Sequence, residues 1–595
     1  MDASHPAVQV VVSPDPLTHQ FHVVVSLDAP QDCVFRLPNW IRGSYLVRDF
    51  AKHVSALAAE REGAALAIER LDKSSFRVLA PAGAVTLRYS VYAYDESVRK
   101  AFIDTRRGFF NASSLVYCPA GFEQSAFALR VEKPALAAAQ DWQLATALNA
   151  VDADASGFGA YRAANYETLI DSPVEMAAFQ RIDFVARDVP HTLTLSGRCE
   201  VDRARLVQDL TRICSAQREM FGDEPAMPRY WFLTHVTANS YGGLEHREST
   251  ALVCARADLP RPGTTGLSRE YRTFLGLCSH EYFHLWNVKR ITPQGFAGSD
   301  LQAAGYSRDL WHYEGVTSYY DDLFLLRAGV IDAPSYLDLV AEAATRLERT
   351  PARLAHTLAD ASFETWIKYY QPDENSPNAS TNYYVKGALV ALCLDLILRR
   401  DSIATLDDVL RALWQRYGRV DVPAPEGALE AVAAELSSLD LKPFFDAALR
   451  GTAELALAET LADFGVLAQR RVATGDSDGG GRNTAVPLRC TLGCKLKADG
   501  SVAHVITGSP AQQAGLAGGD VLIALDGFNI SAGNFARRLN ALAPGVPVEL
   551  FWFRSDELMR AQITPQAAAA DTWTLTLMDT LNATMAARRQ AWLNV

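Results

Sequence analysis

The apolar residues in the first third of the chain follow the period of β-strands. Segments rich in β-branched and aromatic side chains, several of them alternating with polar residues, recur between turn residues. Strands are predicted at Val8–Val12, Phe21–Leu27, Thr86–Tyr94 and Phe127–Val131. The stretch 40–54 breaks the pattern and is expected to be an irregular or functional excursion. We predict a β-rich N-terminal domain over residues 1–185, built as a sandwich or a large open sheet.

From about residue 186 the spacing of apolar residues becomes helical, apart from one more strand-like segment at Tyr230–Thr237. Ser favours a helix N-terminus and Gly commonly follows a C-terminus, so these residues set the expected limits. Helices are predicted from Ser268 as N-cap through Arg290, from Ser307 as N-cap to Gly329, over Tyr384–Arg400 and over Leu406–Tyr417. Residues 186–471 are therefore expected to form an α-rich core behind a small sheet.

The C-terminal part contains a glycine-rich break followed by a compact segment. Val472–Ala485 has four Gly and no apolar stripe, which is typical of a linker or an exposed loop, placed here at 472–486. A module is predicted at 487–566, and residues 567–595 are predicted to be a tail that packs on the core. The whole chain is thus expected to be a multidomain α+β protein.

Composition and charge exclude several classes of protein. The chain has 595 residues, 49% hydrophobic and 21% charged, which are ordinary values for a globular protein. The 57 Lys and Arg against 69 Asp and Glu give a net charge of −12, and no basic tract stands out. Nucleic acids and anionic lipids bind basic surfaces, so neither is expected as a partner.

No segment predicts a membrane span, since the longest apolar run, Gly387–Leu398, contains Asp395 and is much shorter than about 20 residues. The N-terminus lacks the basic and apolar regions of a secretory signal, so a cytoplasmic location is expected unless a leader was removed. The nine scattered cysteines do not resemble a disulfide framework and are predicted to be reduced thiols.

The strongest chemical signal is the pattern His280-Glu281-Tyr282-Phe283-His284. Two histidines four residues apart lie on one face of a helix, so both imidazoles can reach a single zinc ion. Glu281 then points toward a neighbouring water, which suits metal-assisted hydrolysis. The bare pattern also arises by chance, so its surroundings decide its weight.

Glu314 supplies a third ligand in the next predicted helix, 314 − 284 = 30 residues after His284. A catalytic zinc takes three protein ligands and leaves one position for water, and His280, His284 and Glu314 form such a set. His312 competes, but at 100° per residue it lies about 200° around the helix from Glu314. Asp321 returns to the face of Glu314, where it either accepts a ligand imidazole N–H or faces solvent.

Three motifs carry a resemblance to known peptidases. HEYFHLW followed by LWxxEGxTxYY resembles the gluzincin metallopeptidases, whose third zinc ligand is a Glu on a later helix. The segment 242–246, GGLEH, resembles the G-x-M-E-N strand of the alanyl aminopeptidase and leukotriene hydrolase family, whose Glu holds the substrate α-amino group. The segment 384–387, YVKG, resembles that family's Y-x-K-G, whose Tyr hydrogen-bonds the oxyanion. Each motif alone is an ordinary turn or packing element, but together they follow the family's chain order.

Two departures narrow the resemblance. The gap between His284 and Glu314 exceeds the usual gluzincin spacing, which implies an inserted loop near 292–306, and His246 replaces the motif's Asn. With its β-rich start and C-terminal module, the whole chain resembles the glycyl aminopeptidase family of PDZ-containing zinc peptidases. This implies a thermolysin-like α-rich catalytic domain at 186–471 and a PDZ domain at 487–566. The PDZ domain is expected either to bind a peptide ligand or only to pack on the catalytic domain.

The resemblance implies an aminopeptidase with one Zn²⁺ per chain that removes an N-terminal residue, with Gly or Ala preferred, from peptides with a free N-terminus. Glu281 would act as general base, and Tyr384 would stabilise the oxyanion. Glu245 would pair with the substrate α-ammonium. The substrate-binding residues that the resemblance implies are Glu245, Gly242, Gly243 and His246.

Two other functions remain open. A zinc endopeptidase would share the metal site but would not need Glu245. A peptide-binding protein on an inactive peptidase scaffold would work through its PDZ domain, although the intact HExxH, Glu314 and Tyr384 speak against it. The residue patterns do not define the physiological substrate, the S1 side-chain preference, the PDZ ligand or the oligomeric state.

Overall fold

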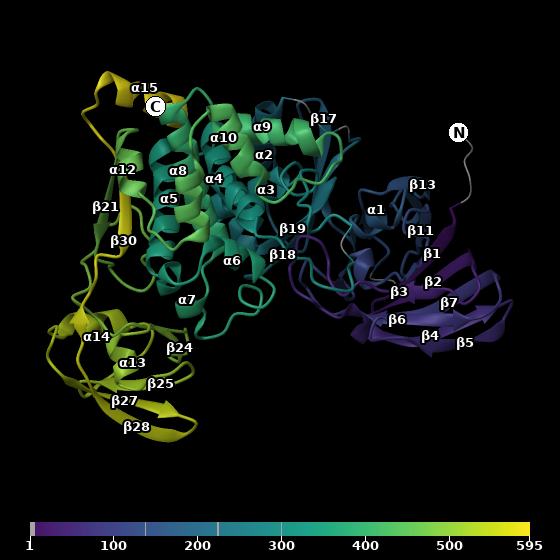
Figure 1. Ribbon diagram of the computed structural model, residues 1–595. Coiled ribbons are helices and arrows are strands. Elements are labelled where there is room, and N and C mark those ends of the chain that lie inside the picture. Colours follow the sequence, from purple (N-terminus) through teal and green to yellow (C-terminus); the bar gives the residue numbers. More distant parts are fainter. Residues whose placement is uncertain (1–5, 137–138, 223–224, 226, 299) are drawn as a thin grey trace. The chain divides into compact units, whose positions relative to one another are not determined.

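The computed structural model describes residues 6–136, 139–222, 225, 227–298 and 300–595. Backbone contacts divide the chain, shown in Figure 1, into two units. Unit 1 comprises residues 1–305 and 417–423, and unit 2 comprises residues 306–416 and 424–595. Within the described ranges, no helix is both long enough and apolar enough to cross a membrane.

Unit 1 begins with an eleven-stranded sheet, purple to blue in Figure 1, in the order β10-β3-β6-β5-β4-β7-β2-β1-β11-β14-β13. Its strands are β1 Val8–Asp15, β2 Gln20–Ala29, β3 Val34–Arg36, β4 Val54–Arg61, β5 Ala64–Arg70, β6 Ser75–Leu79, β7 Gly83–Tyr92, β10 Cys118–Pro119, β11 Phe127–Val131, β13 Asn149–Ala153 and β14 Gly159–Ala163. Buried residues alternate with more exposed ones along β2, as in a sheet with one face on the core. The four predicted strands are confirmed as β1, β2, β7 and β11, although β7 ends at Tyr92 rather than Tyr94.

A second sheet of unit 1, ordered β12-β15-β9-β8, contains a buried ion pair. Its strands are β8 Ala101–Ile103, β9 Arg107–Phe110, β12 Gln143–Ala145 and β15 Val174–Ala177. Arg107 donates to both carboxylate oxygens of Glu175, at 2.8 and 2.7 Å. Ser196 at the end of the next sheet's β17 donates to the same carboxylate. The buried, bidentate pair links β9 to β15 within this sheet, and the Ser196 hydroxyl connects it to the neighbouring sheet.

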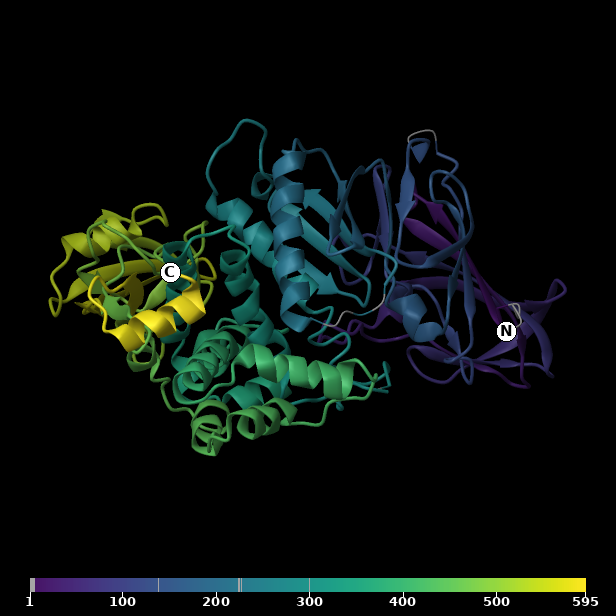
Figure 2. The ribbon, with the colours of Figure 1, turned by 90° about the horizontal axis from the view of Figure 1, so that it is seen from above.

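The third sheet of unit 1 is the small sheet expected for the middle of the chain. Its order is β16-β17-β18-β20-β19, with bounds β16 Gln180–Ala186, β17 Val189–Ser196, β18 Tyr230–Thr237, β19 Gly242–Glu245 and β20 Ser249–Ala255. The strand predicted at Tyr230–Thr237 is confirmed, and β17, β18 and β20 run parallel. The long helix α2 (Arg203–Phe221) lies along this sheet in Figure 2. The antiparallel strand β19 forms one edge.

Helix α3 (Arg269–Phe283) begins as predicted but ends early. The Ser268 hydroxyl caps it by accepting from the Tyr271 backbone N–H at 3.1 Å. The predicted end at Arg290 is wrong, because the helix stops at Phe283. Val288 has a φ of 117°, a conformation that no helix residue adopts, so the helix could not have continued to Arg290. The second histidine of the HExxH pattern therefore lies at the end of the helix.

Helices dominate unit 2, shown in green in Figure 1. They include α4 Thr317–Arg327, α5 Ala333–Glu348, α6 Leu358–Phe363, α7 Ser376–Ala379, α8 Tyr383–Asp401, α9 Leu406–Leu413, α10 Ala428–Ser437, α11 Lys442–Phe445 and α12 Leu457–Ala462. The predicted helices at 384–400 and 406–417 are confirmed as α8 and α9, the latter continued by a π-helical turn, η7 Trp414–Gly418.

The helix predicted from Ser307 is only partly as expected. Its first turn is π-helical, η5 Trp311–Val316, and α4 continues it to Arg327 before Gly329 turns with a φ of 64°. Ser307 accepts from the Asp309 N–H and does not cap the helix itself. A π turn has more residues than an α turn, so His312 and Glu314 are separated by somewhat less than 200° and still lie on nearly opposite sides of the turn.

Two glycines bring η5 and α8 into backbone contact. A Cβ at Gly315 would lie 2.5 Å from the Gly387 Cα, and one at Gly387 would lie 2.9 Å from both the Gly315 Cα and the Trp311 carbonyl oxygen. Only residues without a side chain fit at this crossing. Gly387, the last residue of the YVKG motif, thus holds α8 against the turn that carries Glu314.

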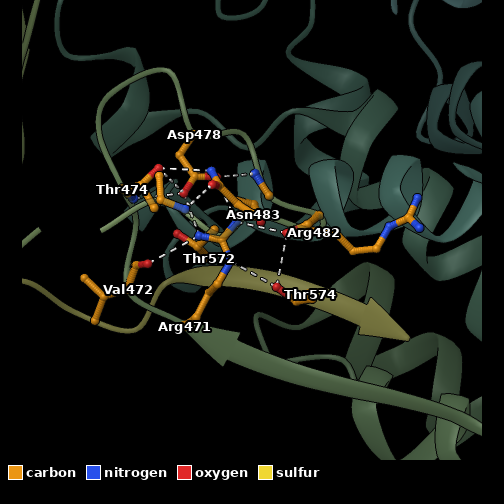
Figure 3. Close-up of polar contacts among 12 residues, drawn as sticks. Arg471, Val472, Thr474, Asp478, Arg482, Asn483, Thr572 and Thr574 are labelled. Atoms are coloured by element: carbon orange, nitrogen blue, oxygen red, sulfur yellow. Dashed lines mark hydrogen bonds and ion pairs between the residues drawn. The ribbon is translucent and has the colours of Figure 1, made fainter. Parts of the chain in front are cut away.

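The glycine-rich segment after residue 471 is folded against a pair of strands. β21 (Val466–Arg471) pairs with β30 (Thr572–Leu577), which comes from the far C-terminus. Figure 3 shows Arg471 binding the carboxylate of buried Asp478 and the hydroxyl of Thr574. Burial would raise the pKa of Asp478, but Arg471 and two backbone N–H groups hold it well below its usual range. The segment is therefore anchored by a buried ion pair.

In the sequence, the chain between β21 and β30 forms a module with its own apolar core, yellow-green in Figure 1. Its elements are β22 Cys490–Thr491, β23 Cys494–Leu496, β24 Val502–Val505, α13 Pro510–Gln513, β25 Val521–Leu525, β26 Phe528–Asn529, α14 Phe535–Ala541, β27 Val548–Arg554, β28 Glu557–Ile563 and β29 Gln566–Ala567. After β30 comes the terminal helix α15 (Ala583–Leu593), on which buried Trp592 packs against Tyr336 of α5.

We expect Gly387→Ala to lower the free energy of unfolding by about 1–3 kcal/mol, because the added methyl group must force η5 and α8 apart. Thermal or urea unfolding of the full chain checks this. Gly533→Ala is the matched control, since a Cβ there meets no atom within 4 Å. Equal stability of the two variants would mean that the glycine contact does not constrain the helices.

Candidate functional site

The end of α3 presents the histidines of the HExxH pattern together. The ring centroids of His280 and His284 are 4.7 Å apart, with the rings nearly perpendicular. His284 is buried and His280 half-buried. The C-terminal end of a helix carries partial negative charge, which favours a cation at this position. The predicted placement of both imidazoles on one face is therefore found in the structure.

A backbone contact sets the protonation of His284. Its Nδ1 lies 2.8 Å from the carbonyl oxygen of Asn287. A carbonyl oxygen only accepts, so Nδ1 carries the proton and Nε2 is the nitrogen able to bind a metal ion. The turn that follows α3 after Phe283 supplies this carbonyl, so the local fold fixes the tautomer of His284.

Glu281 lies in a buried group with Glu245 and His284. Each of the three offers one possible ligand atom, and these atoms lie within 4.8 Å of one another. The Glu281 carboxylate stands directly over Gly243 of β19, where a Cβ would lie 2.1 Å from its Oε1. Its Oε2 is 3.5 Å from the Thr250 hydroxyl on the neighbouring strand β20. The space for Glu281 therefore depends on the absence of a side chain at residue 243.

Glu245 is a buried carboxylate at the end of edge strand β19. It is 4% exposed, and its Oε1 has no hydrogen-bond partner among the described residues. Gly43, with a φ of 86°, lies against it so closely that a Cβ would be 2.3 Å from Oε1. Buried carboxylates without partners are costly, and they occur where a ligand completes them. A cationic ligand group beside Glu245 would satisfy this oxygen.

A cavity of about 510 Å³ within unit 1 reaches Glu245. Residues 40–45 form part of its wall, from the segment predicted to be an irregular or functional excursion, and Phe296 stacks on Tyr45 there. That segment is irregular as expected, with only the short 3-10 helix η1 (Phe50–His53) and an isolated bridge from Ile41 to Ser44. A segment of the β-rich region therefore contributes to the site.

His246 lies in a charged cluster that sequence reasoning missed. Its Nδ1 is 3.1 Å from Asp171 Oδ1, and the same oxygen accepts from the Lys289 ammonium at 2.7 Å. Burial would raise the pKa of Asp171, but Lys289 and His246 hold it well below its usual range. Asp171 and Lys289 are distant from His246 in sequence and belong to no motif, so no pattern could have revealed the cluster.

Unit 2 carries the other predicted site residues. Glu314 is buried in the π-helical turn η5. Tyr384 lies in the first turn of α8, where the Asn382 side chain accepts from its backbone N–H at 2.9 Å. Burial, and next the charge of Glu314, raises the pKa of Tyr384 well above its usual value. The phenol therefore stays protonated at neutral pH and can donate a hydrogen bond.

The two remaining candidates also lie in unit 2. Burial lowers the pKa of His312 to about 3, so this imidazole is neutral, and its ring stacks on Tyr313. Asp321 on α4 is half-buried and accepts the backbone N–H of Asp322. A hydrogen bond from a ligand imidazole N–H to Asp321 stays a prediction.

Comparisons with known proteins agree on one family. Residues 9–178 match the family described as Peptidase M61 N-terminal domain, and residues 273–390 match M61 glycyl aminopeptidase. An aminopeptidase N family protein from Idiomarina loihiensis has a similar structure, with a TM-score of 0.95 and 36% sequence identity. The similarity covers 98% of this chain and 100% of that one.

An M1 zinc metallopeptidase from Deinococcus radiodurans is a more distant structural neighbour. It has a TM-score of 0.48 and 15% identity over 76% of this chain and 94% of its own. No functionally curated protein matches the chain significantly. From the two family matches and the full-length Idiomarina relative, the chain belongs to the M61 glycyl aminopeptidase family of peptidases and is a metallopeptidase.

Proposed function

We propose that this protein is a zinc-dependent aminopeptidase that removes a single N-terminal residue from peptides with a free α-amino group. The observation that carries the proposal is Glu245, a buried carboxylate with an unpartnered oxygen beside Glu281 and His284. An α-ammonium group is the substrate feature that would satisfy this carboxylate. The family's description as glycyl aminopeptidases supports the same reading.

The donor set of the chain fits a single zinc ion. His280, His284 and Glu314 each offer one ligand atom, and two imidazoles with one carboxylate are a known ligand set of catalytic zinc sites. The Nδ1–H···O bond of His284 prepares its Nε2 for such an ion. When bound, zinc supplies Lewis-acid polarisation of the scissile carbonyl and acidifies the attacking water.

The side chains of the site then have separate roles in amide hydrolysis. Glu281 accepts the proton of the attacking water and delivers it to the leaving amine, so one carboxylate acts first as base and then as acid. The protonated Tyr384 hydroxyl donates to the oxygen on which negative charge develops. Glu245 pairs with the α-ammonium and so places the first peptide bond, and no later one, at the reacting groups.

This role of Glu245 distinguishes the proposal from an endopeptidase. A substrate with an acetylated or internal amide brings no charge to Glu245 and would leave a buried carboxylate unpaired. The preference for Gly or Ala at the first position rests on the family alone. The cavity of about 510 Å³ that reaches Glu245 does not restrict the side chain to a small one.

We also propose that residues 487–566 form a PDZ domain. Support comes from the module's separate apolar core and from the turn between β22 and β23, where Gly493 has a φ of 73°. Asn378 of α7 donates to the carbonyl of Val505 and accepts from the N–H of Thr507, at 2.9 and 3.0 Å. These bonds favour the reading in which the module packs on the catalytic part, while a peptide ligand would add at its sheet edge.

Removal of the metal should abolish hydrolysis of alanine p-nitroanilide, because neither the water nor the carbonyl is then activated. We expect one zinc per chain by elemental analysis before chelation, and recovery of activity when zinc is returned. Full activity of metal-free protein would contradict the proposal.

Glu245→Gln should lower kcat/KM for free-amine substrates by about 100-fold or more, since it removes the charge that binds the α-ammonium, while zinc content stays unchanged. Acetylated and free-amine peptides should then be cleaved at more similar rates. Glu248→Gln, which removes a carboxylate from the wall of the same cavity, is the matched control. If Glu245→Gln still preferred free-amine over acetylated peptides as strongly as the parent, Glu245 would not bind the α-ammonium group.

Gly243→Ala should reduce kcat by about 10- to 100-fold with little loss of stability, because the new methyl group displaces the flexible Glu281 carboxylate rather than the backbone. A double-mutant cycle checks the cause. In a Glu281→Gln background the same substitution should have little further effect on the residual rate. An undiminished second effect would mean that Gly243 acts through another group.

A further inference from the structure

Unit 2 contains a second, smaller cavity, which is lined in part by the side chain of Lys386. Its volume is about 40 Å³. Its charged wall residues come from α5, the adjoining 3-10 helix η6 (Pro351–Leu354), α8, the loop before α12, and β21, and they are Glu348, Arg353, Lys386, Glu454 and Arg470. None of these residues has a role in the proposed hydrolysis.

Lys386 is a buried cation without a partner. It is 2% exposed, and its Nζ has no hydrogen-bond partner among the described residues. Burial, and next the Arg353 guanidinium, lowers its pKa to about 8, so most of the amine is still protonated at pH 7. An ammonium that is protonated and buried needs a negative charge or several acceptors close by.

The two carboxylates of the cavity wall are already bound by arginines. Arg353 contacts Glu348 Oε1 at 3.0 Å and Glu454 Oε1 at 3.1 Å, and Arg470 lies 3.5 Å from Glu348 Oε2. The indole N–H of Trp573 also points to Glu348, at 3.4 Å. Three cations therefore face two carboxylates, and the wall carries a net charge of +1 that no side chain of the wall balances.

We propose that this cavity binds one small monovalent inorganic anion of the chloride type, held by the Lys386 ammonium beside the Arg353 guanidinium. The size permits this, since a cavity needs about 10–15 Å³ to hold one water, so 40 Å³ is enough for a single halide. Larger anions such as gluconate do not fit. The anion would fasten α8, the helix that carries Tyr384, to α5 and to the loop at Glu454.

The first test measures thermal unfolding of the full, metal-loaded protein in sodium chloride and in sodium gluconate at equal ionic strength. Chloride should raise the unfolding midpoint of the parent by about 2–4 °C relative to gluconate. Lys386→Met should lose this difference. Lys442→Met, which removes an exposed lysine of unit 2, should keep it. An equal chloride effect in the parent and in Lys386→Met would overturn the proposal.

The second test does not depend on the folding of a variant. Crystals of the parent grown with sodium bromide should show an anomalous peak in the cavity beside Lys386 and Arg353. The absence of a peak there would overturn the proposal. A peak without any chloride-specific stabilisation in solution would mean an adventitious ion only and would overturn it as well.

Discussion

Two buried carboxylates beside a histidine are the constraint on which the site depends. Glu245 and Glu281 present oxygens within 4.8 Å of each other and of His284. At an effective dielectric constant of about 20, two negative charges at that separation repel by about 3–4 kcal/mol. A cation close to both carboxylates would remove this repulsion. A bound metal ion and a substrate ammonium are the two cations that the proposed reaction brings to these carboxylates.

Close contacts explain where glycine is required. Gly243 leaves room for Glu281, Gly43 leaves room for Glu245, and the contact of Gly315 with Gly387 sets α8 against the turn of Glu314. Each glycine is required by a neighbour distant in sequence. The motifs GGLEH and YVKG therefore combine polar groups for which we propose a role at the substrate with glycines that fit closely against neighbouring residues.

Much of this arrangement could be predicted from the sequence. Local sequence is enough to predict the strands of the N-terminal sheet, the Ser268 cap and the two histidines on one helix face. These features depend on residues that are close together in the chain. The end of α3 at Phe283 could not be foreseen, because no Gly or Pro follows it before Pro293 and a positive φ is unusual for a β-branched residue such as Val288. The π-helical turn at Glu314 and the Asp171–Lys289–His246 cluster also escaped prediction, since they arise from packing between segments far apart in the chain.

The pairing of β21 with β30 determines how the C-terminal module is connected to the rest of the chain. The chain leaves the helical part at Arg471 and returns beside it at Thr572, so the module is an insertion into a hairpin and not an appendage. Cutting the chain after residue 486 would remove β30 and α15 together with the module, and would expose the edge of β21 and the apolar surface under Trp592. Removing the module alone would require joining the chain again between β21 and β30, whereas simple truncation also removes β30 and α15.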